Sequence, residues 1–413
     1  MSNTASRYAV WMILLAAAGT FALTMGTRQT MGLFLSDVNT ATGLGIANIS
    51  LAFAFGQLWW GLTQPFAGAF ADRVGAGRVL LVGVCLVALG TILTPLMTST
   101  AGLIFAIGVL AAGGAGMAGP SVLMAATTRM LPAEKRGMAT GIVNAGGSFG
   151  QFIMAPVAAG LTAALGWMTS MQVLGLIVLL ALPAAWVLRG NSSAAASTAA
   201  TGVAGGPAPA REGTRAAITR ALADPSYRLL ACGFFVCGFH VAFLATHLPN
   251  VVAMCGLPPS VSAWSLGLLG LFNIVGSLAM GWAVGRWRMK SLLSLVYAAR
   301  AIAVLVFLLS PKTATTMLIF AAVMGLTYLS TVPPTAGLVA KFFGPANMAT
   351  LFGIVMLSHQ IGGFTGAWLG GKVFTLTGSY DTIWIIDILL AVGAALVHMP
   401  IKEAPLALKM QAA

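Results

Sequence analysis

Long apolar stretches, separated by short polar breaks, divide this chain from end to end. A helix needs roughly 20 apolar residues to cross a bilayer, and runs of that length can be counted along the sequence. There are twelve, at 8–35, 46–71, 79–97, 102–129, 138–164, 168–188, 227–253, 261–284, 291–310, 314–341, 348–376 and 382–401. The runs are continuous and do not alternate between apolar and polar residues, which excludes a closed β-barrel. The sequence therefore predicts an all-α membrane protein with twelve transmembrane helices.

Charged residues are scarce. They make up 7% of the 413 residues, whereas soluble domains carry roughly 25%. The net charge of +13 would indicate nucleic-acid binding in a soluble protein, but here we expect the lipid bilayer as partner and no nucleic acid. The four cysteines show no zinc or disulfide spacing, and we find no nucleotide loop or nucleophile motif. We therefore expect no metal, no cofactor and no enzymatic activity.

Lys and Arg are distributed unevenly between the two sides of the predicted membrane. Only Lys312 and Lys372 fall outside if the N-terminus lies inside. The inward loops and tails then hold Arg7, Arg73, Arg78, Arg129, Lys135, Arg136, Arg189, Arg211, Arg215, Arg220, Arg228, Arg286, Arg288, Lys290, Lys341, Lys402 and Lys409. Because positive loops stay in the cytoplasm, we expect both termini to be cytoplasmic and the protein to lie in the cell (inner) membrane.

The two halves of the chain resemble each other at a shift of 212 to 213 positions. The matching positions are Gly26 with Gly238, Arg28 with His240, Gly68 with Gly281, Arg73 with Arg286, Arg129 with Lys341 and Gly141 with Gly353. This repeat predicts two pseudo-symmetric six-helix bundles, 1–190 and 225–413, joined by a cytoplasmic linker at 191–224. Parallel repeats of this kind place a substrate site on the axis between them.

Two loop motifs carry a family resemblance. The stretch Gly68-Ala-Phe-Ala-Asp72-Arg73-Val-Gly75-Ala-Gly-Arg78 resembles the loop-2/3 signature of the major facilitator superfamily, and Leu131-Pro132-Ala-Glu134-Lys-Arg136-Gly137-Met-Ala-Thr-Gly141 resembles its loop-4/5 companion. With the twelve spans and the repeat, the likeness covers essentially the whole chain. It implies the major facilitator fold and a secondary active transporter that works by alternating access.

These loops are candidates for a gate. An Asp at the end of a helix can pair with an Arg of the other half in one state and release it in the other. The predicted gating residues are Gly68, Asp72, Arg73, Gly75, Glu134 and Arg136. The alternative is that the arginines only anchor the loops inside, which leaves Asp72 unexplained. The second copy has Gly285 in place of Asp72, so the gate should be asymmetric.

Other residues resemble the monocarboxylate-porter and oxalate–formate-antiporter branch. They are the stretch Gly26-Thr-Arg28-Gln29-Thr-Met-Gly32-Leu-Phe34, the glycines Gly113, Gly114, Gly116 and Gly119, and His359. The branch implies a small organic anion, a monocarboxylate in particular. Two departures count against a dicarboxylate such as oxalate: the eighth stretch has Asn273 and no Arg, and the eleventh has His359 where the oxalate antiporter has a lysine.

Only two cations lie deep in apolar stretches, Arg28 and Arg300. Such a charge costs about 2.5–3.5 kcal/mol on insertion scales and marks function. The guanidinium of Arg28 suits a carboxylate because it donates in bidentate fashion. The alternative is an arginine capped by carbonyls for helix packing. For Arg300, on a peripheral helix, we expect a structural role with Asp387 as its counter-ion.

Two histidines are candidates for proton coupling, His240 and His359, because histidine titrates near neutral pH. The alternative is a hydrogen-bonded interior histidine. Both are also predicted to bind substrate, together with polar residues that could equally tie helices together. The predicted substrate-binding set is Arg28, His240, His359, Gln29, Asn144, Asn273, Tyr328 and Gln360.

The sequence thus favours a secondary transporter of a small organic anion, with a proton as candidate co-substrate, acting as a monomer. A drug or neutral-solute transporter of the same fold is the first alternative. An exporter of cations needs a carboxylate in its cavity, and the acidic residues lie in loops, at helix ends or on the twelfth stretch. The second alternative is a membrane sensor without transport activity, which would need an output domain.

Overall fold

The structure is a computed structural model that describes residues 2–131, 133–189, 214–343 and 348–404. Over those ranges every regular element is a helix. Most of the predicted linker, and part of the predicted gate loop at Pro132, lie outside them. The end of the molecule where α10 ends and α12 begins is called the linker end below, and the opposite one the far end.

The first half contains six helical rods, several of them interrupted by short 3-10 or π segments. Their elements are α1 (Ser2–Thr30), η1 (Met31–Phe34), α2 (Leu35–Thr42), α3 (Ile46–Val74), α4 (Ala76–Leu93), η2 (Thr94–Leu96), α5 (Thr100–Leu103), η3 (Ile104–Ala112), α6 (Gly113–Met117), α7 (Pro120–Met130), α8 (Ala133–Leu165), α9 (Trp167–Val178), η4 (Leu179–Ala181) and α10 (Leu182–Val187).

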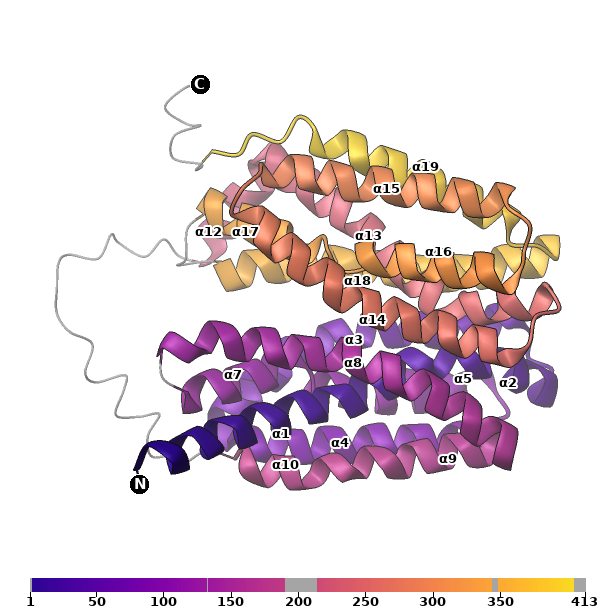
Figure 1. Ribbon diagram of the computed structural model, residues 1–413, viewed down its shortest axis with the longest axis horizontal. Helices are drawn as coiled ribbons and strands as arrows, with labels where there is room; N and C mark the ends of the chain where they lie inside the picture. The colour runs from indigo at the N-terminus through magenta and orange to yellow at the C-terminus, as the bar shows by residue number, and fades with distance from the viewer. Residues whose placement is uncertain (1, 132, 190–213, 344–347, 405–413) are drawn as a thin grey trace.

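The second half repeats this arrangement after the short helix α12. Its elements are α12 (Thr214–Ala223), α13 (Pro225–Met254), α14 (Pro259–Val284), α15 (Met289–Leu309), α16 (Ala314–Thr327), α17 (Val332–Phe343), α18 (Met348–Thr377) and α19 (Asp381–His398). The first half (indigo to magenta) lies below the second half (rose to yellow) in Figure 1.

Within the part of the chain that the structure describes, twelve helical rods cross the body of the molecule, as predicted. Ten of the segments there are long and apolar enough to span a membrane. The other two are α3 and α18, of 29 and 30 residues, which are long enough to cross a bilayer at about 1.5 Å per residue. The helix starts also repeat, because α14 begins 213 positions after α3 and α17 begins 212 positions after α7. The twelve-helix, two-bundle fold is therefore confirmed.

Glycines matched by the repeat let the same pair of helices pack closely in each half. A Cβ added to Gly26 of α1 would collide with the backbone of Gly150 on α8. In the second half a Cβ on Gly238 of α13 would collide with the carbonyl of His359, and one on Gly362 with that of Phe235. Small residues that allow such approach stabilise helix pairs in lipid. The repeat in sequence is thus a repeat in packing.

The loop between α3 and α4 also depends on a glycine. Gly75 both ends α3 and begins α4, with φ +93° and ψ 141°. Side-chain-bearing residues rarely adopt this backbone conformation, which is essentially reserved for glycine. The predicted gate loop is therefore a single sharp turn between two long helices.

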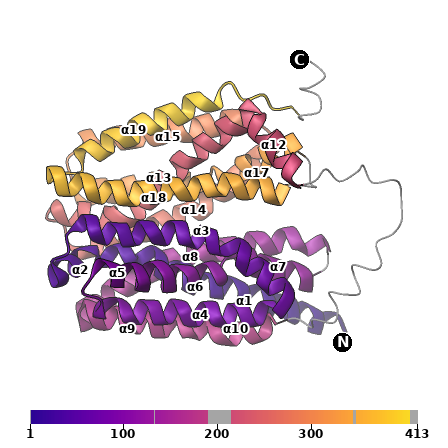
Figure 2. The same ribbon diagram turned by 180° about the vertical axis from the view of Figure 1, so that it is seen from behind.

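The two halves contact each other mainly toward the far end. On the α3–α18 side, which Figure 2 shows side by side, Gly371 packs against Ser50 and Gln360 packs against Gly61. On the other side, Gly270 of α14 packs against α8. Nearer the linker end, four glycines matched by the repeat meet no atom within 4 Å of an added Cβ: Gly68, Gly141, Gly281 and Gly353. These four positions therefore border open space.

Candidate functional site

Arg28 lies near the far-end terminus of α1, where the two halves meet. One guanidinium nitrogen donates to Oε1 of Gln57 on α3, and the guanidinium lies 4.8 Å from the ring centre of Trp60. Within the described ranges no carboxylate lies at ion-pair distance from it. A cavity of about 30 Å³ adjoins Arg28 and Gln57, which is room for one or two waters. The arginine is thus positioned by neutral groups and not neutralised.

Residues of the second half complete the surroundings of Arg28. The side chain of Gln29 lies close to Tyr328, and so does the charge of Arg28. The hydroxyl of Tyr328 donates to the carbonyl of Val241, at 2.9 Å. Three of the predicted binding residues, Arg28, Gln29 and Tyr328, therefore lie together across the interface between the halves.

Asn273 acts as a tie between the halves in this conformation. Its Nδ2 donates to Oγ of Ser148 on α8 at 2.8 Å, and its Oδ1 accepts from the backbone N–H of Leu329 at 3.0 Å and from Oγ of Ser277 at 3.2 Å. Both the nitrogen and the oxygen of the Asn273 amide are thus hydrogen-bonded. Of the two roles considered for this residue, the observed contacts are those of helix tying.

Buried polar atoms without partners gather on the helices that face the other half. Nε1 of Trp60, Nε2 of Gln151 and Nε2 of Gln360 have no hydrogen-bond partner among the described residues. An unsatisfied buried donor costs roughly 1–3 kcal/mol. Such groups are therefore normally occupied by water or a ligand. They mark the interface between the halves as a polar site.

The ring of His359 lies on α18 and packs against Phe234 of α13, with ring centres 4.8 Å apart. The side chain is 7% exposed, and neither ring nitrogen makes a hydrogen bond with correct geometry to a described residue. An imidazole ring nitrogen that carries a proton can donate to a bound anion. It remains a candidate for both predicted roles.

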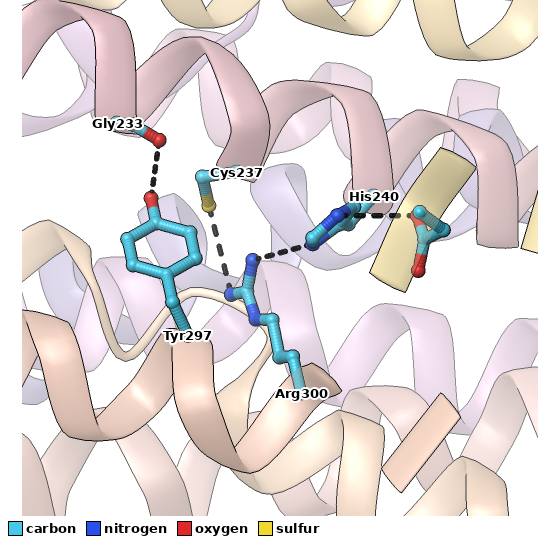
Figure 3. Close-up of polar contacts among 6 residues, drawn as sticks. Gly233, Cys237, His240, Tyr297 and Arg300 are labelled. Atoms are coloured by element: carbon cyan, nitrogen blue, oxygen red, sulfur yellow. Dashed lines mark hydrogen bonds and ion pairs between the residues drawn. The ribbon is translucent and has the colours of Figure 1, made fainter. Parts of the chain in front are cut away.

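His240 has a different environment, drawn in Figure 3. Its Nδ1 lies 3.4 Å from Nη1 of Arg300, and its Nε2 lies 3.2 Å from Oδ1 of Asp387. Nη2 of Arg300 donates to the carbonyls of Thr327 and Tyr328, the second at 2.8 Å. The sequence paired Arg300 with Asp387 directly, but the imidazole lies between them. His240 thus makes its polar contacts inside the second half, with α15 and α19.

The contacts of Arg300 also explain the break between α16 and α17. Residues 328–331 are not helical, so nearby carbonyls lose their helical partners. A backbone acceptor without a partner is costly in lipid. The Arg300 guanidinium supplies the missing donors, and its ring contact with Tyr297, at 5.2 Å, holds it in place. The break is therefore held by a buried charge.

The remaining predicted residues lie nearer the linker end. Asn144 is exposed on α8, one turn closer to that end than Ser148. Arg73 is exposed, and Gly68 borders open space. The side chains of Asp72, Glu134 and Arg136 lie outside what the structure describes, so the pairing proposed for the gate stays a prediction.

Sequence reasoning missed Gln57 as a site residue. It is the side chain that holds Arg28, and it lies on α3, whose segment 46–71 is mostly apolar. An amide in the middle of such a stretch was the available signal. Trp60 lies against the guanidinium of Arg28 and is 8% exposed.

Comparison with known sequences agrees with this arrangement. The profile of the Major Facilitator Superfamily matches residues 15–367 and 256–409. Monocarboxylate transporter 13 of Rattus norvegicus is 25% identical over 401 residues, covering 94% of this chain and 89% of the relative. The uncharacterized MFS-type transporter YcxA of Bacillus subtilis is 23% identical over 402 residues, covering 94% of each chain.

Solved structures show the same fold. A bacterial homologue of the human lysosomal transporter Spinster, in an inward-facing and unoccupied conformation, superposes with a TM-score of 0.76 at 15% identity, covering 94% of this chain and 96% of that one. The D-xylose–proton symporter superposes with a TM-score of 0.75 at 14% identity, covering 96% of this chain and 98% of that one. With its two six-helix halves and a profile match over most of its length, this chain belongs to the major facilitator superfamily and is a membrane transporter.

Proposed function

We propose that this protein transports a small organic anion, a monocarboxylate in particular, through the interface between its halves. The observation that carries the proposal is Arg28, a cation without a carboxylate partner among the described residues, held by Gln57 and Trp60. A cation in the apolar part of a membrane protein needs a counter-charge, and a carboxylate substrate supplies one with matching geometry. The relatives named as monocarboxylate transporters support the same class.

The linker end faces the cytoplasm in this proposal, and the membrane is the cell (inner) membrane. Described arginines and lysines concentrate at that end, including Arg73, Arg189 and Arg286, and positive residues mark the cytoplasmic side. The open space beside Gly68 and Gly353 then makes this an inward-facing conformation. The loops with Asp72 and Glu134 close that side in the opposite state. The transporter acts as a monomer.

Uptake into liposomes tests the substrate class. We expect the purified protein to admit labelled short monocarboxylates such as pyruvate, and to admit dicarboxylates, neutral sugars and organic cations little above empty liposomes. The physical reason is that one guanidinium offers one carboxylate-sized site. Transport of a neutral solute or a cation, with none of any monocarboxylate, would contradict the proposal and favour a drug or neutral-solute transporter.

A proton accompanies the anion in the proposed cycle, carried by His240 or His359. We expect His240→Gln or His359→Gln to abolish the acceleration of uptake by an inward proton gradient, because Gln cannot take up a proton, while exchange of labelled for unlabelled substrate persists. His247→Gln is the matched control: this buried histidine is hydrogen-bonded through both nitrogens, to Tyr380 and to the carbonyl of Ala367. Unchanged gradient dependence in both variants and their combination would make the two histidines structural.

A further inference from the structure

A basic pocket lies at the linker end of the second half, away from the interface between the halves. It has a volume of about 370 Å³. Its lining includes Arg288, Lys290, Lys341, Lys402 and Glu403, with a formal net charge of +3 from four cations and one carboxylate. The pocket is built by the start of α15, the end of α17 and the segment after α19. None of its lining residues is among those described around Arg28.

Two of the four cationic side chains have polar partners among the described residues, and two do not. The backbone N–H of Lys290 donates to Oε1 of Glu403 at 2.7 Å, and its Nζ donates to the carbonyl of Met399 at 2.8 Å. Nζ of Lys341 lies 3.3 Å from Oε2 of Glu403. The side chains of Arg288 and Lys402 have no hydrogen-bond or ion-pair partner within the described ranges. The pocket therefore keeps two cations available for an anion.

The contact of Glu403 shows that this pocket already holds an oxyanion. Lys290 lies in the first turn of α15, a 21-residue helix whose N-terminus is preceded by Arg288. Free N–H groups and the helix dipole favour negative charge there. Glu403 also fills a gap in the repeat. Lys290 and Lys341 are the counterparts of Arg78 and Arg129, and the acid that the first half has at Asp72 is missing from the second. The C-terminal segment supplies a carboxylate instead.

Aromatic side chains place this pocket at the level of lipid headgroups. Trp282 and Trp287 are 55% and 56% exposed, with ring centres 5.4 Å apart, close in sequence to Arg288. Exposed Trp residues next to basic ones are typical of the membrane–water interface. The helices α15 and α19 lie along the outer edge of the second half in Figure 1. The pocket is thus built at a surface that lipid reaches.

We propose that this pocket binds the phosphate of an anionic phospholipid headgroup, with Arg288 and Lys402 as its direct ligands. Basic pockets between helices on the cytoplasmic side have the charge and the depth that such headgroups require. Glu403 occupies the N-terminus of α15 and limits the affinity, because it adds a negative charge to the pocket. A bound headgroup joins α15 to the segment after α19.

Titration of the full-length protein in detergent with short-chain phosphatidylglycerol tests the proposal, with binding followed by tryptophan fluorescence. We expect saturable binding of phosphatidylglycerol, and at least about tenfold weaker binding of phosphatidylcholine with the same chains. The double variant Arg288→Gln/Lys402→Gln should bind phosphatidylglycerol at least about tenfold more weakly. Glu403→Gln should bind it more tightly, which structural damage would not produce.

The matched control is Arg286→Gln, whose guanidinium stacks on Trp282 at 3.9 Å and does not line the pocket. It should bind like the wild type. Unfolding temperatures without lipid identify any variant that is misfolded. Wild-type affinity in the double variant, or weaker binding in a stable Glu403→Gln, would overturn the proposal. If inorganic phosphate bound as tightly as phosphatidylglycerol, the pocket would be a site for free phosphate and not for lipid.

Discussion

Replacing Arg28 with Gln is expected to weaken binding of the transported anion by more than about a hundredfold. Charge-assisted hydrogen bonds contribute roughly 1.5–3 kcal/mol each, and about 3 kcal/mol corresponds to more than a hundredfold in Kd. The neutral side chain keeps a donor, but it loses the charge and the planar fork. Arg28→Lys keeps the charge and loses only the fork, so its affinity should fall between the two.

The measurement is equilibrium binding of the best transported monocarboxylate to purified protein, with unfolding temperatures matched. Arg189→Gln is the matched control, since this arginine also stacks on a tryptophan, Trp186, at 4.4 Å, but is exposed at the end of α10. The control should bind like the wild type. If Arg28→Gln bound the anion with nearly the wild-type affinity, Arg28 would be a packing residue, and a neutral substrate would become the better hypothesis.

The second large effect concerns stability. We expect Arg300→Met to destabilise the second half by about 3–5 kcal/mol, the usual cost of removing one partner from a buried charged group. Arg300 is 1% exposed, and so is Asp387. Without the guanidinium, the carbonyls of Thr327 and Tyr328 lose a donor. Among the described residues, the carboxyl of Asp387 then has the imidazole of His240 as its polar neighbour.

Thermal unfolding in detergent measures this effect. The double variant Arg300→Met/Asp387→Asn should regain part of the lost stability, because no uncompensated charge then remains. It should not regain all of it, because the two carbonyls still lack their donor. Cys237→Ala is a control from the same cluster, since a thiol is a weak hydrogen-bonding group. Its Sγ lies 3.7 Å from Nη2 of Arg300, 3.0 Å from Oγ1 of Thr331 and 3.6 Å from the carbonyl oxygen of Tyr328. An unfolding temperature equal to that of the wild type in Arg300→Met would exclude this structural role.

Much of the fold followed from local patterns in the sequence. The apolar stretch 261–284 is helical because its backbone has no other way to be satisfied in lipid, and it appears within α14, Pro259–Val284. The Gly26–Gly238 match predicted a repeat, and the structure shows why both positions are glycine: each lies where another helix backbone passes closely. Helix ends were less predictable, since Gly75 allows α3 to continue to Val74, beyond the predicted end at residue 71.

Only part of the candidate site could be predicted from the sequence. Arg28 and Gln29 stood out as polar residues in an apolar stretch, and they do meet Tyr328 of the other half. His240 stood out for the same reason, and its sequence position matches that of Arg28. Its imidazole nevertheless makes its contacts with Arg300 and Asp387. Residues at matching positions of a repeat have equivalent backbone positions. The contacts of their side chains depend on which charged groups lie nearby.

The sequence by itself determined that this protein lies in a lipid bilayer, how many helices cross it and that its two halves repeat. These properties depend on the length and hydrophobicity of single segments. Tertiary structure alone decided which polar residues meet. Gln57 holds Arg28 across 29 positions of sequence, and Glu403 reaches Lys290 across 113. Such pairs depend on how helices are rotated and packed against one another, and rotation is set by the shapes of all the neighbouring side chains together. Buried charge is stable only with a partner, so the packing of the helices decided the role of each charged residue.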